Sequence, residues 1–356
     1  MNSAKPFAAE TPSRSSIRRV VFLILRLAVG IGALAWLQKS GALDLHSLAR
    51  LLRMWPLTLV AVGTLFLDLL LMAVRVSLLF RVQRLSLSSG NALQLTLIGF
   101  LFSMVLPGTA GGEIAKFYYA SRENQGRRPE IAAALLLDRL IGLFSMILLP
   151  LLFAPFFPQL IHSIPAIKDI LRIDALLAVG LLLAVILVMS YEPARFWFSG
   201  WLTRWPSLQG LWNRMTQAIA SYREARVTLL LAVILSLLGN SAFLAVTALA
   251  FYATSPGPFA LRVFLMAPIG YLVAALPLTP GGLGVGEAAF NALFALAGMG
   301  GGAAALLSVR VWNAIVGLFG LAVYLRGMGR IVHWEQESSR EEAVGGLVVE
   351  SGQEPV

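Results

Sequence analysis

Cysteine is absent from the 356 residues, and histidine occurs only three times. The missing thiols exclude a disulfide framework, a cysteine nucleophile and a thiolate-ligated metal site. His46, His162 and His333 all fall in hydrophilic connections or near the C-terminus, so no imidazole is expected within the apolar segments. No Asp-x-Asp metal pair and no phosphate-binding glycine loop is present either. The sequence therefore predicts no catalytic residue, no metal and no cofactor.

Charged residues are also scarce, at 13%, whereas hydrophobic residues make up 58% of the chain. Soluble domains carry about 25% charged and roughly 45–50% apolar residues. The mean hydropathy is +0.79, and several apolar runs exceed the roughly 18 residues at which a membrane span becomes the better interpretation. The sequence predicts an all-α polytopic membrane protein.

Six apolar stretches are long enough for full transmembrane helices: about 20–37, 55–80, 131–157, 174–190, 227–252 and 303–325. Two further stretches, 91–106 and 262–277, each run into a Pro/Gly cluster and then restart. The helix-breaking positions are Pro107, Gly108, Gly111 and Gly112 in the first cluster, and Pro277, Pro280, Gly281 and Gly282 in the second. Broken backbone at membrane depth is tolerated only inside protein or beside water.

The distribution of Lys and Arg decides whether these two broken segments cross the membrane. If both dip in and return, with the N-terminus in the cytoplasm, the cytoplasmic segments hold 17 Lys/Arg and the external segments hold six. If both cross once, the numbers become 11 inside and 12 outside. Positively charged residues concentrate on the cytoplasmic side, so the sequence predicts two re-entrant broken hairpins.

The charge distribution also divides the chain into three parts. Residues 1–19 form a basic cytoplasmic tail, 20–330 form the membrane domain, and 331–356 form an acidic, disordered cytoplasmic tail. Without the six acids and one base of the last part, 27 basic and 12 acidic residues remain. Such an excess is typical of loops that face an anionic membrane surface rather than of nucleic-acid binding. We expect a bacterial inner-membrane protein with both termini in the cytoplasm.

The two Pro/Gly clusters belong to an internal repeat. LPGTAGG, starting at Leu106, matches LPLTPGG, starting at Leu276, and AAALLLDR, starting at Ala132, matches AAALLSVR, starting at Ala303. The two repeats extend over about 55–157 and 227–325. The expected topology sends the two hairpins in from opposite sides, so the repeats are predicted to be inverted. Inverted repeats with interrupted helices indicate a transporter with a site near the membrane midplane.

Polar residues within the apolar segments are candidates for that site, because an ionisable group in a membrane usually faces a partner or water. The candidates for substrate binding are Asp68, Arg75, Glu113, Lys116, Asp138, Arg139, Glu287, Arg310 and Asn313. Arg139 and Arg310 occupy equivalent positions in the two repeats, roughly 10–13 Å into their spans. A deep guanidinium at each place suits binding of a lipid phosphate from either side.

Structural alternatives remain open for these residues. Glu113 and Glu287 each begin the return limb of a hairpin, where a carboxylate also caps a helix. Asp138–Arg139 and Asp68–Arg75 could be buried ion pairs that hold spans together, and Arg75 could instead extend to the membrane interface. A structural Arg139 would be paired with Asp138 or Asp68, and a structural Arg310 with Glu287.

Three segments resemble a known family. PGTAGGEIAKFYYASR, AAALLLDRLIGL and PLTPGGLGVGEAAF are similar to motifs of the flippase-like membrane domain of bacterial lysylphosphatidylglycerol synthases. The resemblance covers about residues 20–330 and implies a protein that translocates a phospholipid or glycolipid, with membrane lipids as partners. Aminoacyl transfer belongs to a separate soluble domain in that family, and this chain ends after a short acidic tail, so that activity is not expected here.

Two other functions remain open. One is a membrane-embedded glycosyl- or lipid-transferase, which the absence of His, Cys and nucleotide-binding motifs disfavours. The other is a non-transporting accessory protein of a hopanoid, dolichol-type or other lipid or polysaccharide pathway, which acts with a pathway partner or as a homo-oligomer. The resemblance favours lipid translocation over both.

Overall fold

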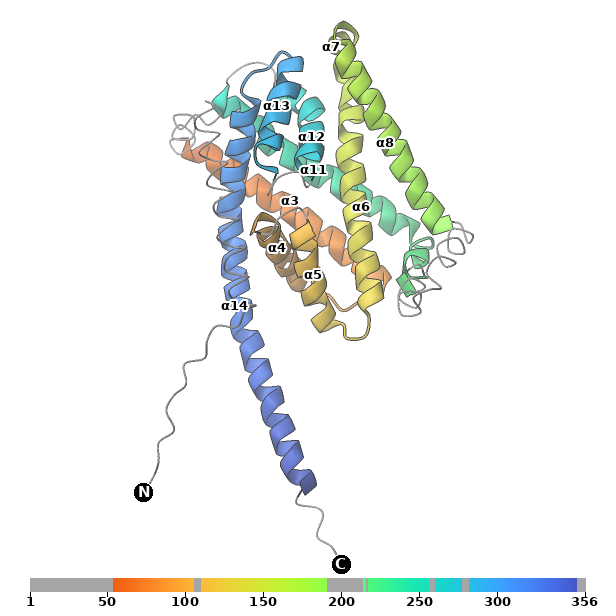
Figure 1. Ribbon diagram of the computed structural model, residues 1–356, viewed down its shortest axis with the longest axis vertical. Helices are drawn as coiled ribbons and strands as arrows, with labels where there is room; N and C mark the ends of the chain where they lie inside the picture. Colours follow the sequence, from red (N-terminus) through yellow and green to blue (C-terminus); the bar gives the residue numbers. More distant parts are fainter. Residues whose placement is uncertain are drawn as a thin grey trace, which may run out of the picture.

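The computed structural model describes residues 54–105, 110–190, 214–215, 217–255, 260–276 and 282–350, which are helical and contain no strand (Figure 1). The long helices are α3 (Trp55–Val82), α6 (Arg128–Phe153), α8 (Pro165–Ser190), α11 (Arg226–Thr254) and α14 (Gly302–Glu350). The short ones are α4 (Ser89–Val105), α5 (Ala110–Glu123), η1 (Ala154–Phe156), α7 (Pro158–Ser163), η2 (Ala260–Arg262), α12 (Val263–Ala274) and α13 (Val285–Leu296). The predicted all-α class is confirmed for these residues.

Among the residues that the structure describes, four helices are long and apolar enough to cross a membrane: α3, α6, α11 and the part of α14 up to Arg326. They coincide with the predicted spans 55–80, 131–157, 227–252 and 303–325. Large apolar side chains on these helices face outward, among them Leu59, which is 62% exposed, and Leu318, which is 65% exposed. Such an apolar exterior is suited to lipid rather than water. The chain is a multi-pass membrane protein.

The two remaining predicted spans have different outcomes. Span 174–190 falls in α8, which begins earlier, at Pro165, and carries Asp169, Arg172 and Asp174 in its first half. Figure 1 shows α8 beside α6, with α7 at the end where the chain turns between them. Span 20–37 lies outside the described residues, together with the tail 1–19 and the breaks Pro107, Gly108, Pro277, Pro280 and Gly281.

Each broken segment is a pair of antiparallel helices. In the first pair, Asn91 near the start of α4 donates to Glu123 at the end of α5, with a distance of 3.2 Å. In the second pair, Arg262 just before α12 donates to the carbonyl of Ala297 just after α13, at 2.6 Å. A helix therefore lies on each side of both breaks, as the Pro/Gly clusters predicted.

The order long helix, helix pair, long helix occurs twice along the chain. α3 begins at Trp55 and α11 at Arg226, and this spacing equals that between the matching segments that start at Ala132 and Ala303. We call residues separated by this spacing equivalent positions of the two halves. The packing is also repeated, because α3 packs on α4 as α11 packs on α12, and α14 packs on α4 as α6 packs on α12. Each half thus places its last long helix against the helix pair of the other half.

Glycine permits the close contact within each helix pair. A Cβ at Gly99 of α4 would lie 2.7 Å from the Lys116 side chain on α5, and a Cβ at Gly270 of α12 would lie 2.6 Å from the ring of Phe290 on α13. These two glycines occupy equivalent positions of the two halves. Gly282 has a φ of 67° and touches the backbone of α12, so the second break requires glycine for both conformation and space.

α3 and α11 run antiparallel where the two halves meet. Near the end of α3, Arg75 donates to Ser236, whereas Asp68, earlier in α3, contacts Gly239, later in α11. Asp68 and Gly239 are themselves equivalent positions. Equivalent positions of the two halves thus touch each other at this crossing.

Three of the segments predicted to be cytoplasmic meet at one end of the helix bundle. The side chain of Arg127, just before α6, donates to the carbonyl of Gln83, just after α3, at 2.6 Å. Gln83 in turn donates to the carbonyl of Ala218, just before α11, at 2.6 Å. Arg122, Arg128 and Arg214 line one surface groove there. Arg122, Arg127, Arg128 and Arg214, which belong to segments 116–130 and 191–226, therefore lie at the same end of the bundle as the end of α3.

The last long helix extends into the acidic tail. α14 runs from Gly302 to Glu350 and so includes most of residues 331–356, for which the sequence predicted an acidic, disordered tail. Figure 1 shows this end of α14 projecting beyond the other helices. Glu, Ala and Arg, which recur in this segment, are good helix formers, so helix can continue here without a packing partner.

Candidate functional site

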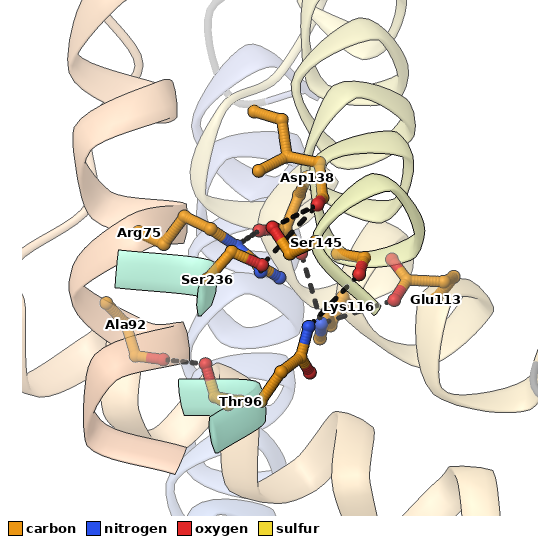
Figure 2. Close-up of polar contacts among 11 residues, drawn as sticks. Arg75, Ala92, Thr96, Glu113, Lys116, Asp138, Ser145 and Ser236 are labelled. Atoms are coloured by element: carbon orange, nitrogen blue, oxygen red, sulfur yellow. Dashed lines mark hydrogen bonds and ion pairs between the residues drawn. The ribbon is translucent and has the colours of Figure 1, made fainter. Parts of the chain in front are cut away.

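A buried network of charges joins α3, α5 and α6 (Figure 2). Arg75 Nε donates to Asp138 Oδ1 at 2.6 Å. Lys116 Nζ lies 3.8 Å from Asp138 Oδ2 and 3.2 Å from Glu113 Oε1. Two cations and two carboxylates thus form a balanced chain, in which Asp138 is shared by Arg75 and Lys116.

The burial of this network makes each partner necessary. Arg75, Lys116 and Asp138 are only 4%, 4% and 2% exposed. Removing an ion from water costs several kcal/mol, and close partners of opposite charge must offset that cost. Arg75 Nη1 also donates to Ser236 Oγ of α11 at 2.7 Å. The network therefore connects the first half of the membrane domain to the second.

A cavity of about 220 Å³ lies beside the network, and Arg75 and Ser236 line it. Its wall comes from α3 and α6 of the first half and from α11 and α12 of the second. The polar side chains in the wall are those of Asp68, Arg75, Ser236, Asn240 and Tyr271. The cavity thus combines polar groups with apolar surface between the two halves, as expected of a ligand site in a helical bundle.

The pattern of charges in the sequence does not predict three of these polar residues, which are Ser236, Asn240 and Tyr271. Ser236 and Asn240 lie four positions apart and so share a face of α11. Asn240 Nδ2 donates to the carbonyl of Gly142 on α6 at 3.2 Å, and the Tyr271 hydroxyl lies 2.8 Å from the hydroxyl of Thr247. Neutral polar residues that lie three or four positions apart within an apolar span are the sequence pattern that would predict this face of α11.

A second ion pair fixes the other helix pair to α14. Arg310 Nε lies 3.0 Å from Glu287 Oε1, and Arg310 Nη2 donates to the carbonyl of Gly282 at 3.2 Å. Glu287 Oε2 accepts from the backbone N–H of Gly284 at 2.6 Å, where α13 begins. Glu287 is therefore a helix cap and an ion-pair partner at once, and Arg310 holds the break of the second helix pair.

The two ion pairs occupy related positions with opposite polarity. Lys116 and Glu287 each lie on the second helix of a helix pair, and each pairs with the following long helix, at Asp138 and at Arg310. In the first half the helix pair supplies the cation, and in the second half it supplies the carboxylate. In each half, one salt bridge thus connects the second helix of the helix pair to the following membrane-spanning helix.

The chain matches one family model over most of its length. The model is described as the lysylphosphatidylglycerol synthase TM region, and it matches residues 23–323. The chain belongs to this family. No curated protein and no solved structure matches it. The matched range includes all the charged site residues, so the network, the cavity and the second ion pair lie within the family's membrane region, which relates the protein to lipid metabolism.

Two interpretations of Arg75 in this family member are wrong. The guanidinium does not extend to the membrane interface, because Arg75 is 4% exposed and bonded to Asp138. Its short salt bridge is with Asp138 rather than with Asp68, although Asp68 and Arg75 both line the cavity and the charge of Arg75 acts on Asp68. Spacing along one helix placed Asp68 and Arg75 on a common face, but the carboxylate of Asp138 on α6 lies closer to Arg75, and sequence alone does not reveal which helices are neighbours.

The other predicted residues are placed as follows. Arg139 follows Asp138 on α6 and is half-buried, whereas Asp138 directs its two oxygens to Arg75 and Lys116. Asn313 on α14 is half-buried, and its Oδ1 has no hydrogen-bond partner within the part of the chain that the structure describes. Those same residues include no group of three His, Cys, Asp or Glu side chains placed to hold a metal ion.

Proposed function

We propose that the protein is a lipid translocator, which moves the headgroup of a phospholipid or glycolipid between the two leaflets. The observation behind the proposal is the cavity of about 220 Å³ between the two halves, with charged and neutral polar groups in its wall. A headgroup needs such polar groups to replace water as it crosses the membrane. The acyl chains meanwhile stay in the bilayer beside the apolar outer surface.

The proposed architecture is an inverted repeat with two re-entrant helix pairs. Its support is the antiparallel packing of α3 and α11, in which Asp68 contacts its equivalent position, Gly239. A two-fold axis through that contact is perpendicular to both helices, so it lies in the plane of the membrane that they cross. Repeats related in this way are typical of transporters that expose one site to each side in turn.

The phosphate of the headgroup is assigned to Arg139 and Arg310 in this proposal. The two arginines occupy equivalent positions of the two halves, and a guanidinium binds two phosphate oxygens through parallel N–H donors. Asp68, Arg75, Glu113, Lys116, Asp138, Glu287 and Asn313 complete the proposed set of substrate-binding and supporting residues.

The direct test is purified protein in liposomes with labelled phospholipids, scoring inward and outward movement separately. We expect movement well above that of protein-free liposomes, without added nucleotide or divalent metal, because the sequence offers no site for either. A rate equal to the protein-free rate for anionic, zwitterionic and glycosylated lipids would refute the translocator. Restoration of activity only by ATP or a metal would favour an enzyme or a pump.

The membrane orientation is part of the proposal: an inner-membrane protein with both termini in the cytoplasm. Single cysteines in this cysteine-free chain make it testable. We expect an impermeant thiol reagent to label Lys168→Cys in intact cells, and Arg127→Cys and Arg214→Cys only after the membrane is opened. External labelling at position 127 would contradict the re-entrant arrangement, because a crossing helix pair places that residue outside.

A further inference from the structure

Asp68 differs from the other charged residues around the cavity. Arg75, the second charged residue in the wall, is bonded to Asp138. Asp68 forms no hydrogen bond and no ion pair with any of the residues that the structure describes. Its carboxylate is half-buried and contacts Gly239 of α11. The cavity therefore contains one carboxylate without a hydrogen bond or salt bridge to the described residues, and the charge of Arg75 acts on it only through space.

The charges near the cavity do not balance. Arg75 and Lys116 are matched by Asp138 and Glu113, so an ionised Asp68 adds one uncompensated negative charge. An isolated carboxylate in an apolar environment is so costly that it takes up a cation or becomes neutral. A proton is the smallest cation that does this: it forms one O–H bond on the carboxylate and leaves a neutral acid, and no other bond is broken.

Water can deliver that proton. A cavity of about 220 Å³ has room for several water molecules, each of which takes about 30 Å³ in the liquid. None of the groups that face Asp68 in the cavity wall forms a salt bridge that would fix its carboxylate in the ionised form. On α3, the charged neighbour of Asp68 in the cavity wall is Arg75, which is bonded to Asp138 of α6. On α12, the titratable neighbour is the hydroxyl of Tyr271, which interacts electrostatically with Arg310 of α14. The α11 side chains in the wall, Ser236, Asn240 and Phe243, do not titrate.

The position of Asp68 is the second observation. It lies where α3 crosses α11, against the residue equivalent to itself in the other half. A group at the contact between two halves related by a two-fold axis is equally far from the two membrane surfaces. It can therefore be exposed to each surface in turn when the halves move. A coupling ion of a transporter must bind at such a place.

We propose that Asp68 is a proton-binding site that couples lipid movement to a proton gradient. Coupling rests on the proposed translocator function, whereas proton binding does not. When the cavity opens to the acidic side, cavity water protonates the carboxylate. When it opens to the alkaline side, the O–H bond breaks and the proton leaves to water. The phosphate of the lipid headgroup is bound by Arg139 and Arg310 during this cycle.

Proton binding is tested by infrared spectra of the purified protein at neutral pH, where exposed carboxylates are ionised. We expect a protonated carboxyl C=O band in the wild type, a smaller band in Asp68→Asn, and an unchanged band in Asp169→Asn, because the buried Asp174 is present in all three proteins. Asp169 is a suitable control because it is 63% exposed and paired with Arg172 on the surface. A spectrum of Asp68→Asn with the band unchanged, or a wild type without the band, would overturn proton binding.

Coupling is tested in liposomes with and without an imposed pH gradient. The gradient is expected to make wild-type lipid movement directional, whereas inward and outward movement by Asp68→Asn are expected to be the same with and without the gradient. Equal responses of the wild type and Asp68→Asn would overturn coupling. If neither protein moves lipid, the translocator proposal and coupling fail together, and the infrared result still decides proton binding. Thermal melting of Asp68→Asn and Asp169→Asn shows whether either variant is misfolded.

Discussion

Asp138→Ala is expected to lower the free energy of unfolding by about 3–5 kcal/mol, because it leaves two buried cations without their shared carboxylate. Arg75 loses its hydrogen bond of 2.6 Å, and Lys116 keeps only Glu113. Both cations are almost completely buried. The measurement is the yield of folded protein and its thermal melting in detergent.

Asp169→Ala is the matched control for this prediction. Its salt bridge with Arg172 has a similar length, 2.9 Å, but both side chains are more than 60% exposed. Exposed pairs contribute about 0–1 kcal/mol, so little change is expected. Similar melting of the two variants would show that the Asp138 network is not a structural element.

Removing Asp138 together with one of its cationic partners should restore much of the stability that Asp138→Ala loses. In Asp138→Leu with Arg75→Met, Lys116 still has Glu113 at 3.2 Å, so the remaining charges are balanced. Replacing a buried ion pair by apolar residues of similar volume is often neutral or stabilising. We expect the double variant to melt well above Asp138→Ala, and we expect it to have lost lipid movement, because Arg75 and its partner line or adjoin the cavity.

Arg310→Ala is expected to abolish lipid movement and to reduce stability. The carboxylate of Glu287 is 3% exposed and would lose its cation at 3.0 Å. The loss of stability should be smaller than at Asp138, because Glu287 keeps the backbone N–H of Gly284 and Arg310 is itself 26% exposed. Arg310→Lys should recover part of the activity, since it keeps the charge without the planar guanidinium that grips two phosphate oxygens.

A second variant separates the structural role of Arg310 from its proposed role in binding. Combining Arg310→Ala with Glu287→Gln removes both charges and leaves an amide oxygen to cap α13. If Arg310 binds the lipid phosphate, the pair of substitutions restores melting but not lipid movement. Recovery of both would mean that Arg310 serves only to neutralise Glu287, and phosphate binding would then have to be assigned elsewhere.

The helices were predictable because their cause is local. A long apolar run predicts a span, and a Pro/Gly cluster predicts a break, without knowledge of any neighbour. The ends of α3 and α11 and the two helix pairs followed from these rules. The start of α8 did not, because Asp169, Arg172 and Asp174 interrupt the apolar pattern although the helix continues through them.

The sequence predicted which charged residues belong to the site, but not which of them form ion pairs with one another. Arg75, Lys116, Asp138 and Glu287 were all selected as charges in apolar segments, yet the ion-pair partner considered for Arg75 was Asp68 and not Asp138. Which charges meet depends on which helices touch, and that is fixed by distant contacts such as the close approach of α4 and α5 at Gly99. The neutral polar wall of α11 was missed because hydroxyl and amide groups cost far less than charges in a membrane.

Passage of the headgroup through the cavity is the central claim, and blocking the cavity tests it most directly. Met146 lines the cavity and Lys168 is exposed elsewhere, so a cysteine at either place is the only thiol in the chain. A bulky thiol reagent on Met146→Cys should stop lipid movement in liposomes, a reductant should restore it, and the same reagent on Lys168→Cys should have no effect. Unchanged lipid movement after complete modification at position 146 would contradict a route through this cavity.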